Sequence, residues 1–167
     1  MTIEMAGVAG DSIVDGPGIR TTYFAQGCPH RCEGCHNPET WESGVGTPME
    51  TAALADIARA NPLCRGVTFS GGDPFCQPEP LYELAVKLKA DGYHIMSYSG
   101  WTFEQLLAKS EKEPQVRRLL GILDVLVDGR FVLAERSLEL KFRGSRNQRL
   151  IDVPESLRTG KAVTVEL

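Results

Sequence analysis

No stretch of this 167-residue sequence approaches the run of about 18 apolar residues that a membrane-spanning helix requires. The N-terminus, residues 1–10, also lacks a basic start followed by an apolar run, which a secretory leader would have. The sequence therefore predicts a soluble, cytoplasmic protein with no membrane partner.

A general excess of positive charge is missing as well. The chain has 18 Lys and Arg against 22 Asp and Glu, a formal net charge of −4. Surfaces that bind nucleic acid are usually basic, so no nucleic-acid partner is expected. One locally basic segment, residues 130–149, is either a solvated face or a contact for an anion or a partner. It carries Arg130, Arg136, Lys141, Arg143, Arg146 and Arg149 against Glu135 and Glu139.

Internal repeats and low-complexity tracts are absent, and the length suits a single domain over residues 1–167. The five cysteines are an odd number, and three of them fall within eight residues. This distribution argues against a disulfide framework and favours metal or redox chemistry in a reducing compartment.

Strand and helix patterns alternate along the chain, which predicts β-α-β units and a mainly parallel sheet. A complete eightfold barrel needs about 250 residues. The expected fold is therefore α/β, with an open sheet or a partial, incomplete barrel. Strands are expected at 19–26, 66–70, 93–98, 122–127 and, at the end of the chain, 162–166, and helices at 48–60, around 81–88, through 106–107 and at 116–120.

Two of these helices have start signals. Thr47-Pro48-Met49-Glu50 has the pattern of a capping box with proline at the first helical position, which predicts that helix 48–60 begins there. Thr102 and Gln105 resemble a second capping box. The residues expected to face inward from the first helix are Met49, Ala53, Leu54 and Ile57.

The chemically suggestive segments all follow predicted strands. Parallel α/β proteins place their active sites at the carboxyl ends of strands, so these segments are expected to meet at one edge of the sheet. They are the cysteine loop, Gly71-Gly72-Asp73-Pro74, Ser97-Tyr98-Ser99-Gly100 and Asp128-Gly129-Arg130.

The cysteine loop has the spacing Cys-x3-Cys-x2-Cys, at Cys28, Cys32 and Cys35. Three thiolates so close in sequence can converge on one soft metal centre. On a four-iron cubane they would leave one iron without a protein ligand, whereas an electron-transfer cluster is held by four cysteines. A structural zinc held by the same thiolates with His36 or His30 is the competing interpretation.

At this loop the sequence resembles the radical S-adenosylmethionine (SAM) superfamily. Within it, the wider match is similar to the glycyl-radical activases, and to the anaerobic ribonucleoside-triphosphate reductase activating family best of all. The resemblance spans roughly residues 7–153. It rests on the motifs DGPGIR (15–20), GCPHRC (27–32), CHNPETW (35–41), SGGDPF (70–75) and FRGSRNQR (142–149).

The resemblance implies a [4Fe–4S] cluster held by the three cysteines, with SAM bound beside it. Asp73 stands where the superfamily usually has Glu, and Arg130 stands where related activases often have Lys. For Ser97, Ser99 and the Asp128–Arg130 pair, ordinary structural roles stay open. The residues expected to bind the cofactor are Gly34, Cys35, His36, Gly71, Gly72, Asp73, Ser97, Ser99, Asp128 and Arg130.

The implied activity is that of an oxidoreductase. Reductive cleavage of SAM would give a 5′-deoxyadenosyl radical, which would generate a glycyl radical on the anaerobic ribonucleoside-triphosphate reductase. A flavodoxin or ferredoxin would supply the electron.

Three alternatives stay open. The first is another radical SAM enzyme, either an activase of the pyruvate formate-lyase type or a small-molecule enzyme such as the carboxydeazaguanine synthase. The second is a ferredoxin-like carrier, which would need Cys64 or Cys76 as a fourth ligand. The third is a zinc-stabilised binding module.

Overall fold

A computed structural model describes all 167 residues and contains one sheet of seven strands in the order β3-β1-β2-β4-β5-β6-β7. The strands are β1 (Thr2–Ser12), β2 (Arg20–Ala25), β3 (Thr47–Glu50), β4 (Gly66–Gly71), β5 (His94–Ser99), β6 (Val125–Asp128) and β7 (Arg149–Asp152). The α-helices are α1 (Thr51–Arg59), α2 (Pro78–Ala90), α3 (Phe103–Ser110), α4 (Pro114–Ile122) and α5 (Val153–Thr159). Short 3-10 turns are η1 (Pro38–Thr40), η2 (Pro74–Cys76) and η3 (Leu133–Glu135).

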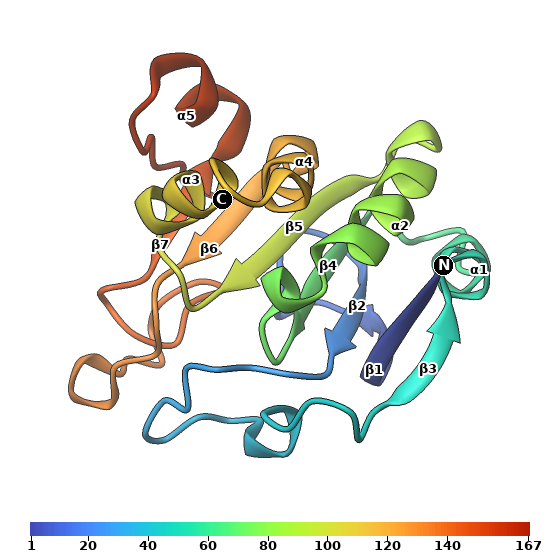
Figure 1. Cartoon of the computed structure of the whole chain (residues 1–167), viewed down its shortest axis with the longest axis horizontal. Coiled ribbons are helices and arrows are strands. Elements are labelled where there is room, and N and C mark those ends of the chain that lie inside the picture. Colours follow the sequence, from blue (N-terminus) through green and yellow to red (C-terminus); the bar gives the residue numbers. More distant parts are fainter.

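The centre of the sheet is parallel and its edges are antiparallel. β2, β4, β5 and β6 pair in parallel, while β1 and β3 on one side and β7 on the other run antiparallel to their neighbours. The expected α/β fold with a parallel, open sheet is confirmed. In Figure 1 the long loops gather at the lower edge, where the arrows of β2, β5 and β6 end.

The helices cover one face of this sheet and enclose the main core. Leu81, Leu84, Ala85 and Leu88 of α2 are all buried, as their helical spacing predicts. They belong to a cluster of 25 buried apolar residues that includes Val67 and Phe69 of β4, Ile95 of β5 and Leu126 of β6. None of the helices has the length and the apolar run that crossing a bilayer requires.

The start of the first helix differs from the prediction. Residues 47–50 form strand β3, which pairs with β1, and α1 begins at Thr51 with Glu50 as an N-cap that makes no side-chain cap bond. Glu50 instead accepts hydrogen bonds from the Thr2 hydroxyl and the N-terminal amine. This later start changes the buried face to Thr51, Leu54, Ala55 and Ala58, so that Ala53 and Ile57 are exposed.

The structure also differs from the prediction at both ends of the chain. Residues 2–12, where no strand is expected, form the long strand β1, and residues 162–166 form only an isolated bridge between Thr164 and Ile151. The edge position next to β6 is taken by β7 instead. The capping box of Thr102 and Gln105 is confirmed at the start of α3.

A buried arginine joins the amino ends of the parallel strands. Arg20, at 1% exposure, donates to the carbonyl oxygens of Pro17, Val67 and His94 and to the Thr68 hydroxyl. Burial lowers its pKa to about 10, so the guanidinium stays protonated at neutral pH. Arg20 makes no ion pair, which leaves these oxygens as its principal partners.

Replacing Arg20 by Met should destabilise the protein by about 2 kcal/mol or more, because each buried acceptor left without a donor costs about 1–3 kcal/mol. Urea denaturation of the protein would measure the loss. The matched control is Arg118→Met on α4, an exposed arginine without an ion pair, which should stay within about 0.5 kcal/mol of the wild type. Equal stability of the two variants would contradict a structural role for Arg20.

Candidate functional site

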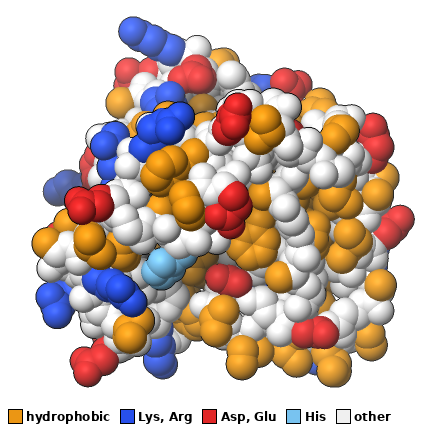
Figure 2. Space-filling view, turned by 90° about the horizontal axis from the view of Figure 1, so that it is seen from below, with side chains coloured by type: hydrophobic (Ala, Val, Ile, Leu, Met, Phe, Trp, Pro, Cys, Tyr) orange, Lys and Arg blue, Asp and Glu red, His pale blue; other side chains and the backbone are white.

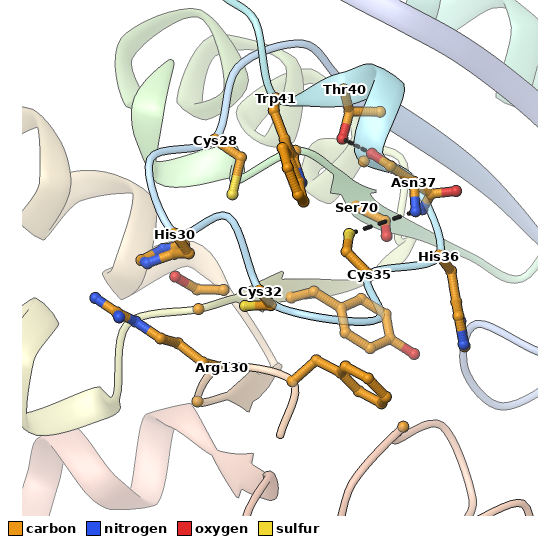
Figure 3. Close-up of a pocket in the computed structure, with 18 of the residues that line it drawn as sticks. Cys28, His30, Cys32, Cys35, His36, Asn37, Thr40, Trp41, Ser70 and Arg130 are labelled. Atoms are coloured by element: carbon orange, nitrogen blue, oxygen red, sulfur yellow. Dashed lines mark hydrogen bonds between the residues drawn. The ribbon is translucent and has the colours of Figure 1, made fainter. Parts of the chain in front are cut away.

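A pocket of about 190 Å³ lies at the carboxyl edge of the parallel strands, between the cysteine loop, the turn after β4 and the segment between β6 and β7 (Figure 3). All three cysteines of the predicted motif line it. The other lining residues are His30, His36, Asn37, Thr40, Trp41, Ser70, Gly71, Gly72, Tyr98, Ser99, Gly100, Gly129, Arg130, Phe131, Gly144 and Gln148.

Backbone hydrogen bonds hold the cysteine loop at its start. The Gly27 and Cys28 amides donate to the carbonyl oxygens of Thr40 and Trp41, at 2.7 and 3.0 Å. The Cys35 amide donates to the Cys32 carbonyl at 3.2 Å, which closes the turn between the last two thiols. The loop therefore returns on itself and points all three sulfur atoms toward the same space, as Figure 3 shows.

The arrangement of the thiols suits a large inorganic group. A single zinc ion needs its ligand atoms within about 2.0–2.3 Å of one point. No three His, Cys, Asp or Glu side chains in the structure are arranged to hold a single metal ion. The thiolates of an iron–sulfur cube each bind a different iron, so they need not meet at one point, and Cys28, Cys32 and Cys35 line one pocket here.

Backbone amides point at two of the sulfur atoms. The Asn37 amide donates to Cys35 Sγ at 3.4 Å. Burial raises the pKa of the Cys28 thiol, and the backbone N–H groups of His30 and Arg31 oppose that rise. Because amide donors favour the anionic form of sulfur, these contacts suit metal-bound thiolates.

The Gly71-Gly72 turn packs directly against the cysteine loop. The Gly72 amide donates to the Ala25 carbonyl and the Asp73 amide to the Gly27 carbonyl, both at 2.8 Å. A Cβ at Gly72 would overlap the Gly27 carbonyl, and Gly71 has a φ of +98°. Both glycines are therefore required for the close approach of the two backbones.

A buried polar network joins the same two loops through side chains. His30 Nε2 lies 2.7 Å from Asp73 Oδ2, and the two side chains are only 3% and 1% exposed. Asp73 also accepts from the Ser99 hydroxyl and from the amides of Gly100 and Phe75. This carboxylate therefore connects the cysteine loop, the β4 turn and the end of β5.

The segment between β6 and β7 forms the remaining wall. Gln148 accepts from the Gly144 amide and donates to the Gly129 carbonyl, which holds this segment across the pocket. The Phe131 ring lies 5.6 Å from the exposed His36 ring, centroid to centroid. Gln148 belongs to the FRGSRNQR motif, whose resemblance was the only sequence signal for its place at the site.

The structure brings eight of the predicted site residues to the pocket and leaves four outside it. The eight are Cys28, Cys32, Cys35, His36, Gly71, Gly72, Ser99 and Arg130. The four that do not line it are Gly34, Asp73, Ser97 and Asp128. Gly34 lies at the outside of its turn, next to Leu133.

Alternation along the strands explains two of these four positions. Ser97 of β5 pairs with the core residue Phe69 and is fully buried on the helix-covered face. Asp128 has the same parity on β6 as the core residue Leu126, accepts from the Phe103 amide at the start of α3, and pairs with Arg149. Tyr98 has the opposite parity and lines the pocket instead.

The two other cysteines do not complete a four-thiolate site. Cys64 is buried near the amino end of β4, where it contacts the Thr21 hydroxyl and the Gly66 carbonyl. The pocket lies at the carboxyl end of that six-residue strand, about 20 Å away. Cys76 is exposed and does not line the pocket.

The two tryptophans and His94 have packing roles. Trp41 lines the pocket and lies beneath the Arg31 guanidinium, and Trp101 meets the edge of the His30 ring. His94 lies beside Arg20 at the amino end of β5, where burial lowers its pKa.

The fold and the site together define an iron–sulfur protein, since residues 14–151 match the family model described as a 4Fe-4S single cluster domain. The chain is also 35% identical over 145 residues to the anaerobic ribonucleoside-triphosphate reductase-activating protein of Vibrio cholerae serotype O1, covering 81% of this chain and 89% of that protein. The protein of that name from Escherichia coli strain K12 is 34% identical over the same length, covering 81% and 90%. The chain belongs to the family of anaerobic ribonucleoside-triphosphate reductase-activating proteins, which confirms the resemblance.

Two further similarities are broader. A pyruvate formate-lyase-activating enzyme of Listeria monocytogenes is 37% identical over 152 residues, which cover 87% of this chain but 59% of that enzyme. The crystal structure of QueE from Escherichia coli matches with a TM-score of 0.50 at 20% identity, over 60% of this chain and 53% of that chain. The second similarity supports the fold alone.

The bond between His30 and Asp73 should be measurable in a double-mutant cycle. His30→Ala and Asp73→Asn should each destabilise the metal-free protein, because a hydrogen bond to a charged group contributes about 1.5–3 kcal/mol. The double variant should lose less stability than the sum of the losses of the two single variants, which corresponds to a coupling energy of about 1 kcal/mol or more. Urea denaturation under reducing conditions gives all four values, and additive losses would show that the two side chains act independently.

Proposed function

We propose that this chain is a radical SAM oxidoreductase, organised as one domain over residues 1–167, whose [4Fe–4S] cluster is held by Cys28, Cys32 and Cys35. The observation that carries this proposal is that three thiols, and no fourth, line one pocket at the carboxyl edge of the sheet. A cluster held in this way would keep one iron free for a small-molecule ligand.

When bound, the reduced cluster would supply one electron to the sulfonium of SAM, whose cleavage gives methionine and a 5′-deoxyadenosyl radical. The protein's part is to bind, orient and shield the reactants. Gly71 and Gly72 expose backbone beside the cysteines, where the amino acid part of SAM would bind. Arg130, with its bidentate fork, suits the carboxylate of SAM, and the Ser99 hydroxyl offers a further hydrogen bond.

Asp73 and Asp128 have positioning roles in this proposal, while Ser97 is buried and bonds only to the neighbouring Tyr98 carbonyl. The Asp73 carboxylate already has four hydrogen-bond partners in the protein, and Asp128 is neutralised by Arg149. Both acids would therefore influence SAM binding indirectly, by holding in place the loops that contact SAM.

The size of the pocket bears on how SAM would bind. Small-molecule sites usually measure about 300–1,000 Å³, and this pocket measures about 190 Å³. A cluster would fill much of that volume, so SAM would extend across the rim. His36 and Arg130 are the exposed side chains of that rim, and His36 would lie near the adenine.

The names of the relatives suggest the partner. We infer that the radical removes a hydrogen from a glycine Cα of an anaerobic ribonucleoside-triphosphate reductase, yielding 5′-deoxyadenosine and a glycyl radical. A flavodoxin or a ferredoxin would supply the electron. Activation of a pyruvate formate-lyase is the second candidate, favoured by the similarity to the Listeria enzyme.

Anaerobically reconstituted protein with dithionite and SAM should release 5′-deoxyadenosine, measured by liquid chromatography. Cys32→Ala should lose at least about 100-fold of this activity together with most of the iron, because metal ligands are required for the cluster. Cys76→Ala is the matched control, since Cys76 is exposed and outside the pocket, and it should keep both. A Cys32→Ala protein that still cleaved SAM would refute the cluster assignment.

Mixing the reduced enzyme and SAM with the reductase should produce the doublet signal of a glycyl radical in electron paramagnetic resonance. The same experiment with pyruvate formate-lyase separates the two candidate partners. A doublet only on pyruvate formate-lyase would replace the proposed partner. No doublet on either protein, from an enzyme that cleaves SAM, would reject the activase proposal and leave the SAM chemistry intact.

A further inference from the structure

Five basic side chains between β6 and β7 lack acidic partners within the chain. Residues 130–149 contain six of the 18 Lys and Arg but only two of the 22 Asp and Glu. Of the six, only Arg149 forms an ion pair. The five others are here called the basic collar: Arg130, Arg136, Lys141, Arg143 and Arg146.

The collar makes few contacts with its own chain. The side chains of Arg130, Arg136 and Arg146 are exposed and form neither an ion pair nor a hydrogen bond. Lys141 and Arg143 donate only to backbone carbonyl oxygens, at 3.4–3.5 Å. No Asp or Glu side chain of the chain therefore forms an ion pair with any of these five cations.

Four of the five collar residues line either the pocket or the groove beside it. Arg130 lines the pocket, and Gln148 lines both the pocket and a neighbouring groove of about 590 Å³. The cations at that groove are Lys141, Arg143, Arg146 and Arg149, against the carboxylates of Glu139 and Glu166. Figure 2 looks at the molecule from below Figure 1 and shows Lys and Arg side chains gathered on the left part of this face.

Apolar side chains lie among these charges. Leu138 is 86% exposed and Leu133 is 42% exposed, and both belong to the same segment. Exposed apolar groups mixed with cations are typical of a protein interface, where arginine is enriched. The cations are also spread along a loop and are not gathered around a buried point, so the arrangement suits an extended partner better than a small anion.

We propose that the basic collar is a docking surface for an acidic polypeptide segment of the protein that this enzyme activates. This inference rests on the proposed function, because a partner that presents a glycine to the pocket must cover its rim. Acidic residues on either side of the presented loop would meet the collar and steer the encounter.

The test compares two double variants with the same change in charge. Arg136→Glu/Arg146→Glu reverses two collar residues that do not line the pocket, and Arg117→Glu/Arg118→Glu reverses two exposed arginines of α4. Binding to the anaerobic reductase is measured by biolayer interferometry at 50 and 300 mM NaCl. The rate of glycyl-radical formation and the partner-free cleavage of SAM are measured alongside.

The collar variant should bind the reductase at least about tenfold more weakly than the α4 variant at 50 mM NaCl, with a lower association rate. The difference should shrink at 300 mM NaCl, because salt screens exposed charges. Radical formation should fall in parallel, while partner-free SAM cleavage stays at the wild-type level.

Equal affinity of the two variants for the reductase would contradict the proposed docking role of the collar, whatever the outcome for radical formation. Weakening of binding to a duplex DNA but not to the reductase would also overturn it. Wild-type protein that yields no glycyl radical would instead reject the proposed function, and the comparison of affinities would still decide whether the collar docks this partner.

Discussion

The structure of the site depends on one close approach, between the backbone of the cysteine loop and the backbone of the turn after β4. Gly27 and Gly72 lie so near each other that a Cβ at Gly72 would overlap the Gly27 carbonyl. Two amide hydrogen bonds, from Gly72 and Asp73, connect the turn to the end of β2 and to the loop. Because this contact is made by backbone atoms, it fixes where the first thiol stands relative to the sheet. It also places the backbone of the β4 turn directly beside the cysteine loop, which is the combination that the proposed cluster with bound SAM would need.

Most polar residues at the strand ends have one of two tasks, according to the face of the sheet on which they lie, and Ser99 has both, since it donates to Asp73 and lines the pocket. On the helix-covered face, Asp73 and Asp128 are buried, and their carboxylates accept hydrogen bonds from backbone amides and neighbouring side chains. On the opposite face, Tyr98 lines the pocket, and its hydroxyl donates to the Phe142 carbonyl at 2.6 Å. At the proposed cluster, an unpaired acid would add negative charge beside three thiolates. The hydrogen bonds to these acids hold the loops in place, although burial and the charge of Asp73 still contribute to the raised pKa of the Cys28 thiol.

The sequence predicts the parts of this site that are local and misses the parts that depend on distant contacts. The spacing of Cys28, Cys32 and Cys35 and the pair Gly71-Gly72 are short patterns, and Thr102 caps the helix that follows it. Thr47 has the same kind of cap signal, yet pairing of β3 with β1 keeps its backbone extended. Whether Ser97 or Tyr98 faces the pocket depends on strand register, which strand composition does not specify. His30 carries no signal of its own, because its partner Asp73 is 43 residues away.

The segment between β6 and β7 has two roles whose physical demands differ. Gly144 and Gln148 pack against Phe131 and the end of β6, so the inner side of the segment is held by hydrogen bonds as a wall of the pocket. Its outer side carries cations without partners and a leucine that is 86% exposed. Exposed cations without partners add little to folding stability, and repulsion among like charges opposes compact packing. Arg130 lines the pocket that contains the three thiols, and Lys141, Arg143 and Arg146 line the groove beside it. If the enzyme generates a radical in that pocket, as we propose, the group that receives the radical has to be brought to the same opening, and the collar would bind the protein that carries this group.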